Sequence, residues 1–270
     1  MWRRVWVLLS LLLLAGCASG LYKIPKDQYR QQVQVLGVLP LMVDAGSTIT
    51  VPQRQQVIDL LRHHNAGSAA RLTELLKKSR GYFDVRAISG VPEQLFSSLV
   101  KDRSLTGSKA SRHWHYNFDP AAVARLTKDH AVDAVLVVIL NGVERSERRW
   151  DRLHLNYLEA KFNDIQATAY VVLPDGRIAW EDPAAAESSF LQLQYPDFDE
   201  AYYNKTDQVR IKNITPAGLD RTLAAPQQGV FSKGNFSERY EELFKNLVGA
   251  LSPGPLNPFT PPAAPQKQEK

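Results

Sequence analysis

Two nearly uninterrupted apolar runs constrain the fold of this chain more than any other feature. They cover residues 33–43 (VQVLGVLPLMV) and 132–143 (VDAVLVVILNGV), and valine is frequent in both. A run without polar alternation is typical of a strand that is covered on both faces. We therefore predict that each run forms a central strand of a sheet.

The pattern around these runs predicts helices and further strands in a mixed order. Helices are expected at residues 53–64, 65–80, 92–101 and 121–130, and a strand at 82–88. Asp119-Pro120 is a strong helix start, because aspartate caps the first turn and proline is favoured at the first helical position. Pro174-Asp175-Gly176 predicts a hairpin that joins a long strand within 153–173 to a strand ending at Trp180.

The carboxyl-terminal half of the chain contains a clear amphipathic helix and several less regular segments. Residues 236–251 carry an apolar stripe, so this helix should pack back on the sheet. Residues 190–195 and 209–214 are expected to form short edge strands, whereas 102–117 and 144–152 (ERSERRWDR) are expected to form a polar loop and a solvated turn. The predicted fold class is α/β (α+β), with a single mixed sheet and helices packed on it.

The first residues have the layout of a secretory signal. Arg3 and Arg4 precede an apolar run of about ten residues, which as a helix spans only ~15 Å of a ~30 Å hydrocarbon core. Leu14-Ala15-Gly16-Cys17 resembles the lipobox of bacterial lipoproteins, which implies cleavage between Gly16 and Cys17 and attachment of acyl chains to Cys17. Three such chains would anchor the protein permanently, at ~0.8 kcal/mol per buried CH₂.

These signals divide the chain into four segments. We expect a lipoprotein signal peptide at 1–16, a lipidated tether at 17–32, an α/β periplasmic domain at 33–251 and a proline-rich, disordered or polyproline-like tail at 252–270. Ala18 follows the cysteine instead of aspartate, which in enteric lipoproteins favours the outer membrane. The expected location is therefore the outer membrane, with the domain facing the periplasm or the cell surface.

The charge balance argues against nucleic acid as a partner. The chain has 33 basic and 28 acidic residues, and loss of Arg3 and Arg4 with the signal lowers the excess from five to three. No basic block or arginine stripe accompanies this small excess. Cys17 is the single cysteine, so lipidation would leave no thiol for redox or metal chemistry.

Motifs for catalysis and metal binding are weak. His113 and His115 would share one face of a strand and could bind Zn²⁺ or Cu²⁺ with a third ligand, but no H-E-x-x-H spacing accompanies them. There is no G-x-S-x-G and no phosphate-binding loop. We therefore predict no cofactor, no metal and no enzymatic activity. The carboxylates weighed for glycosidic chemistry lie near prolines and are expected in solvated loops: Glu181, Asp182, Asp197, Asp199 and Glu200.

An acidic aromatic stretch, YPDFDEAYY, is the best candidate for recognition. Aromatic side chains provide large contact areas at low entropic cost and are enriched at interfaces. The alternative is an ordinary loop that closes over a sheet edge. The candidate partner-binding residues are Tyr195, Phe198, Tyr202 and Tyr203.

Four segments in this order resemble periplasmic modules of the TolB amino-terminal and curli-channel lipoprotein kind. They are GVLP, LTELLKKSRGYFDVRAIS, VARLTKDHAVDAVLVVIL and IQATAYVVLPDGRIAW. The resemblance implies alternating strands and helices followed by a hairpin, without catalytic residues. Two features depart from it: His130-Ala131 replaces a helix-ending glycine, and the segments that would cross a membrane as hairpins are heavily charged or contain Pro196.

The expected function is that of an outer-membrane-anchored lipoprotein acting as a non-catalytic binding or scaffold component of an envelope assembly or transport system. The expected partners are the membrane, through acyl chains on Cys17, and an envelope protein, with an oligomer as an open option. The alternatives are a ring-forming secretion-channel subunit and an enzyme that hydrolyses envelope polymers.

Overall fold

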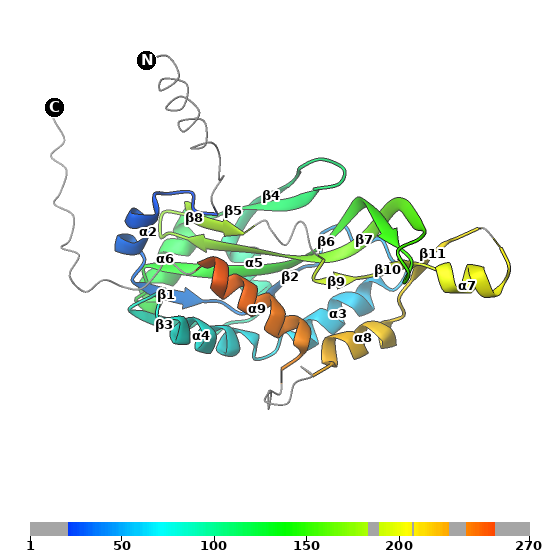
Figure 1. The fold of residues 1–270 in the computed structure, drawn as a ribbon. Coiled ribbons are helices and arrows are strands. Elements are labelled where there is room, and N and C mark those ends of the chain that lie inside the picture. The colour runs from blue at the N-terminus through cyan, green and yellow to red at the C-terminus, as the bar shows by residue number, and fades with distance from the viewer. Residues whose placement is uncertain (1–20, 183–188, 207, 227–235, 252–270) are drawn as a thin grey trace, which may run out of the picture.

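A mixed sheet between two layers of helices forms the centre of the molecule. The computed structural model describes residues 21–182, 189–206, 208–226 and 236–251. The strand order is β3-β1-β6-β7-β8, with β2 beside β6 and β9 beside β7 (Figure 1). The strands of this sheet are β1 (Val35–Val38), β2 (Met42–Asp44), β3 (Asp84–Ala87), β6 (Ala134–Trp150), β7 (Tyr157–Val172), β8 (Ile178–Asp182) and β9 (Leu191–Gln192).

The pairing changes from parallel to antiparallel at β6. β1 pairs in parallel with both β3 and β6, and β2 also runs parallel to β6. β6 to β7 and β7 to β8 are antiparallel, as expected for strands joined by hairpins. The mixed α/β fold class predicted from the sequence is therefore confirmed.

The two apolar runs alternate between the faces of the sheet. In β6, Leu136 and Val138 pack on one face, while Val135 and Val137 pack on the other. Both faces are covered by helices or by a small hairpin, which explains why these runs are apolar apart from Gln34, Asp133 and Asn141.

One face carries most of the helices. α3 (Arg54–His64), α4 (Ser68–Ser79), α8 (Pro216–Ala224) and α9 (Glu238–Leu251) pack there, and Figure 1 shows α9 lying across this side of the sheet. The apolar stripe of α9 is buried in this layer, which confirms that the C-terminal helix packs back on the sheet. The stripe consists of Tyr240, Phe244, Leu247 and Leu251.

The opposite face is covered by α5 (Pro92–Leu99), α6 (Pro120–His130) and an antiparallel hairpin of β4 (Val100–Thr106) and β5 (His113–Phe118). This hairpin occupies the segment that we predicted as a polar loop, so that prediction was wrong. Its side chains are half-exposed on one side, and Tyr116 and Phe118 are the positions that reach the core.

Local capping explains the start and the end of α6. The Asp119 carboxylate accepts a hydrogen bond from the Ala122 N–H at 2.7 Å, and Pro120 occupies the first helical position. At the other end Ala131 takes the left-handed conformation, with φ of 48°, that glycine more often supplies. The departure from the family pattern at this point is therefore accommodated by an alanine.

The folded part begins earlier than residue 33. α2 (Lys26–Gln32) buries Tyr29, and the backbone N–H of Lys23 donates to the Ala179 carbonyl beside β8. Residues 21–32 are therefore packed on the domain, although the sequence suggested a tether. Residues 1–20 and 252–270, which include the signal, Cys17 and the tail, lie outside the described residues.

Within the described ranges, no helix has the length and apolarity needed to cross a bilayer.

Candidate binding surface

The hairpin of β6 and β7 extends well beyond the helix-covered part of the sheet. The two strands stay in register from Val135 opposite Val172 to Trp150 opposite Tyr157. Burial is continuous along the first part of β6 and becomes mixed after Val143. Residues 144–150 were expected to form a solvated turn, and the structure shows that they continue the strand.

Charged pairs across the two strands hold the outer part of this hairpin together. Arg148 contacts Glu159 at 2.9 Å, and Lys161 contacts Glu144 at 3.3 Å. The Arg148 guanidinium also lies 4.4 Å from the centre of the Tyr157 ring. Opposite charges on facing strands stabilise a hairpin that has no core of its own, which accounts for the charged sequence.

The hairpin ends in a cluster of exposed apolar side chains. Leu153 and Leu155 are 76% and 73% exposed, and Trp150 and Tyr157 are about half exposed. The Trp150 ring lies 5.0 Å from Tyr157 and is stacked with His154 at 6.2 Å. Exposed large apolar side chains that gather at one place mark an interaction site more often than isolated ones do.

Asp151 fixes the shape of the loop that carries this cluster. Its carboxylate accepts hydrogen bonds from the backbone N–H groups of Leu155 and Asn156, and from the Asn156 side chain. Desolvation opposes ionisation, but these donors prevail and hold the pKa of Asp151 below its usual value. The loop therefore has a defined conformation although its leucines point into solvent.

The second part of the candidate surface lies beside the hairpin. β10 (Gln194–Pro196) pairs with β11 (Ile211–Asn213), and the short helix α7 (Phe198–Tyr203) connects them. Asp197, which follows β10, is buried. Its carboxylate accepts a hydrogen bond from the backbone N–H of Arg210, just before β11, and so links the two strands. Figure 1 shows α7 and the end of the β6–β7 hairpin at the same end of the molecule.

The structure brings the four predicted aromatic residues to this end in two groups. Tyr202 and Tyr203 are about 80% exposed and contact each other with ring centres 5.8 Å apart. Tyr195 and Phe198 line a groove shared with Trp150 of the hairpin. We call the whole surface the aromatic end. It comprises Trp150, Leu153, Leu155, Tyr157, Tyr195, Phe198, Tyr202 and Tyr203.

The groove has a volume of about 560 Å³ and is lined by side chains of both charge signs. Four carboxylates surround it, and nearby cations offset them: Arg152 lies 4.0 Å from Asp199, and Lys212 contacts Glu200 at 2.8 Å. The hydrogen bond to Glu200 raises the pKa of Lys212, so this lysine stays charged. A groove of this kind favours a ligand that offers apolar area and little net charge.

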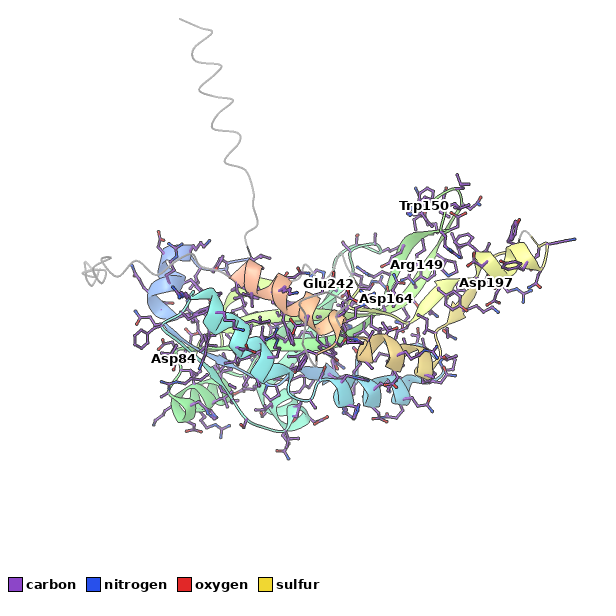
Figure 2. All side chains as sticks on the ribbon, turned by 60° about the horizontal axis from the view of Figure 1, so that its bottom comes forward. Asp84, Arg149, Trp150, Asp164, Asp197 and Glu242 are labelled. Atoms are coloured by element: carbon purple, nitrogen blue, oxygen red, sulfur yellow. The ribbon has the colours of Figure 1, made fainter. Side chains whose placement is uncertain are left out.

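A buried ionic network supports the floor of the groove. The Arg149 guanidinium lies 3.9 Å from the Phe162 ring centre, donates to Asp164 at 2.6 Å, and donates to Glu147 at 2.9 Å. Ser189 also donates to Asp164 at 2.6 Å. Figure 2 shows Arg149 and Asp164 at the base of the hairpin, with Trp150 at its end and Asp197 beside it.

The candidate metal ligands are engaged in local contacts. His113 contacts Thr106 at 3.0 Å, and His115 contacts Glu181 at 2.8 Å. Across the described parts of the chain, no three His, Cys, Asp or Glu side chains are grouped so that they could hold a metal ion. The carboxylates weighed for glycosidic chemistry are divided between β8, which carries Glu181 and Asp182, and the start of α7.

Sequence reasoning missed the hairpin half of the aromatic end. The sequence did contain a signal for it, because large apolar residues recur within this charged segment at positions 150, 153, 155 and 157. The proposed lipid-attachment residue Cys17 and the cleavage position at Gly16 lie outside the described residues.

Comparisons with known proteins do not place the chain in a family. No protein-family model matches the sequence, and no curated protein matches it. A PelC dodecamer from Paraburkholderia phytofirmans is 10% identical, with 82% of this chain and 87% of that chain covered and a TM-score of 0.29. A putative neuraminyllactose-binding hemagglutinin homolog from Helicobacter pylori is 9% identical, with the same coverage and a TM-score of 0.36. At these TM-scores neither similarity carries an argument about function.

Proposed function

We propose that this protein is an outer-membrane lipoprotein whose domain faces the periplasm and acts by binding, as a non-catalytic component of an envelope assembly or transport system. The observation that carries this proposal is the aromatic end. One end of the domain carries four apolar side chains on a protruding hairpin and four aromatic side chains beside it. Such a surface is costly to leave in water, so a partner should cover it.

The anchor would hold the domain close to the membrane, by the end that is opposite the aromatic end: the Leu21 carbonyl accepts a hydrogen bond from the backbone N–H of Glu181 in β8, far from α7 in Figure 1. Leu21 begins the described part of the chain and is only four positions after Cys17, which allows a separation of ~14 Å at most when the chain is extended. A lipidated Cys17 would therefore hold the domain against the bilayer surface. Confinement of this kind raises the effective concentration of any partner in the same membrane.

The absence of an enzymatic role is part of the proposal. The buried charged groups next to the groove are paired with one another, as Arg149, Asp164 and Glu147 show. Pairing of this type fixes the geometry of the base of the hairpin. The groove itself is lined by aromatic rings and by charges such as Asp199 and Glu200 that contact Arg152 and Lys212, which suits recognition.

The anchor is tested by labelling cells with a palmitate analogue. We expect label on the wild-type protein in the outer-membrane fraction and none on Cys17→Ala. Equal labelling of both proteins, or recovery of the wild type in the soluble fraction, would contradict the proposed anchor.

The binding surface is tested by photocrosslinking in intact cells. A photoreactive residue at position 195 or 203 should capture one defined partner, and Trp150→Ala should abolish that capture. The matched control is position 83, because Phe83 is 79% exposed but adjoins Asp84, which Figure 2 places at the far end of the molecule from Trp150. Equal capture from position 83, or capture that does not depend on Trp150, would show that the aromatic end is not the binding surface.

A further inference from the structure

We propose that the occupant of the groove at the aromatic end is the proline-rich segment 253–265 of a second copy of this chain. The inference rests on the proposed function in one respect, because it assumes that the aromatic end is a binding surface. It adds the identity of the partner and the mode of recognition.

The groove has the chemistry that recognises a polyproline II segment. Such segments dock into grooves lined by aromatic rings, and Trp150, Tyr195 and Phe198 line this one. A polyproline II chain forms no internal hydrogen bonds, and each proline lacks an N–H, so the ligand needs donors for its carbonyl groups. Within the described residues the Trp150 side chain makes ring contacts with Tyr157 and His154 and no hydrogen bond, so its indole N–H can donate to a ligand, and the exposed amide of Gln192 also lines the groove.

The tail has a matching three-residue period. A polyproline II helix has three residues per turn, so positions separated by three share an edge. Pro255, Pro258 and Pro261 would form one edge. Leu256, Phe259 and Pro262 would form the neighbouring edge. The third edge carries the polar residues, so a bound segment would offer two apolar edges to the groove.

The charges of the two partners are also compatible. Segment 253–265 (PGPLNPFTPPAAP) contains no ionisable side chain. Each carboxylate of the groove already has a partner: Arg152 contacts Asp199 and Lys212 contacts Glu200, while backbone N–H groups donate to Asp151 and Asp197. Neither partner would therefore bury an unpaired charge on docking, which is the usual obstacle at a buried interface.

Geometry places the groove and the origin of the tail at opposite ends of one molecule. The Leu251 carbonyl accepts a hydrogen bond from the Tyr22 hydroxyl at 3.0 Å, beside β8 and α2, and Figure 1 shows this end of α9 far from α7. Pro255 follows Leu251 by four residues, a reach of ~12 Å, whereas a domain of ~200 residues is ~43 Å across. The segment therefore docks into a neighbouring copy.

A contact between the tail of one copy and the groove of the next is heterologous. Repetition of such a contact produces a ring if the rotation closes, or a filament if it does not. Anchoring of every copy by lipid in one membrane would favour a closed, planar arrangement. The aromatic end of each copy would then be covered by its neighbour.

The test uses two full-length, differently tagged copies that are expressed in the same cells. The donor copy carries p-benzoylphenylalanine at position 259, and the acceptor copy is either wild type or Trp150→Ala. We expect donor–acceptor adducts whose crosslinked peptide lies within 150–157 or 192–203, and at least a fivefold loss of adduct with the Trp150→Ala acceptor. A Phe83→Ala acceptor should give the wild-type yield.

Position 257 provides a second control within the tail, since Asn257 would lie on the polar edge of a bound polyproline II segment. A probe there should give at least fivefold less adduct. Capture of the donor's own chain, capture of a different protein, or a yield that is independent of Trp150 would overturn the inference. If position 259 captures no second copy while positions 195 and 203 capture another envelope protein, the binding surface stands and the occupant is wrong. If all three positions capture nothing, the proposed function fails as well.

Discussion

Asp164→Asn tests whether the buried network at the base of the hairpin determines the stability of the groove. Asp164 is 1% exposed, and its carboxylate accepts hydrogen bonds from the side chains of Arg149 and Ser189, each at 2.6 Å. Arg145 is also buried and lies 3.9 Å from the same carboxylate oxygen. The substitution removes a charge that faces two buried guanidinium groups and leaves the surrounding volume almost unchanged.

The expected loss follows from the contacts that survive. Removal of one partner of a buried ion pair costs ~3–5 kcal/mol. Glu147 still contacts Arg145 at 2.6 Å and Arg149 at 2.9 Å, and the new amide oxygen accepts one of the old hydrogen bonds. We therefore expect the free energy of unfolding to fall by ~2–3 kcal/mol, below the full penalty for an uncompensated buried charge.

Urea unfolding of the wild type and the variant measures this difference. The matched control is Glu159→Gln on the same hairpin, whose exposed pair with Arg148 should contribute only ~0–1 kcal/mol. A loss below ~1 kcal/mol for Asp164→Asn, or a loss equal to that of the control, would refute the view that the buried network holds the base of the hairpin.

Three further predictions concern other parts of the domain. Asp119→Ala removes the cap on the Ala122 N–H, so the free energy of unfolding should fall by ~1 kcal/mol; denaturant unfolding will measure it, and Asp119→Ser should recover most of the loss. Tyr82→Phe leaves the buried Tyr29 hydroxyl without its 2.7 Å partner and should cost ~1–2 kcal/mol in the same assay, with an unchanged stability counting against this account. Desolvation raises the pKa of Glu181, but hydrogen bonds from Lys23 and His115 prevail and hold it below the usual 4.5. A carboxyl group with a depressed pKa adds stability above its unfolded-state pKa and loses it as the pH falls through the folded-state value, so Glu181→Gln should be less stable at pH 7, and the difference should begin to shrink near pH 4.5 and be lost as the pH falls through the lower folded-state pKa. Unfolding curves between pH 3 and 7 will show this, and a difference that stays constant would contradict the assignment.

The parts of the fold that follow local rules were predictable from the sequence. The Asp119-Pro120 pair identified the start of α6, and the turn at Pro174-Asp175-Gly176 was located because Gly176 supplies the positive φ of 80° that this turn requires. The continuous, valine-rich apolar runs identified the central strands, since strands covered on both faces have this composition. The start of α8 has the same pattern as that of α6, with Thr215 as the cap and Pro216 at the first helical position. The sequence prediction did not include this helix.

The outer hairpin was not predictable in the same way. A strand that is covered on both faces has a distinctive composition, but residues 144–150 form a strand that pairs with β7, and the side chains that it buries, Arg145 and Arg149, are charged. Their charged side chains are stabilised by partners such as Glu159 and Lys161, which are more than ten residues away in the chain. Such pairing becomes visible only when the register of β6 and β7 is known. The aromatic half at α7 was predicted because its residues are adjacent in sequence, whereas Trp150 joins them only through the fold.

Hydroxyl-radical footprinting in intact cells tests the central claim most directly. The side chains of Trp150, Tyr157, Tyr202 and Tyr203 are exposed in the isolated chain, and so is Phe83 at the far end. If the aromatic end is the surface that this protein uses, these four side chains should be oxidised several-fold less in cells than in dilute, detergent-solubilised protein, with oxidation of Phe83 unchanged. Equal oxidation of the four side chains in both samples would contradict the claim.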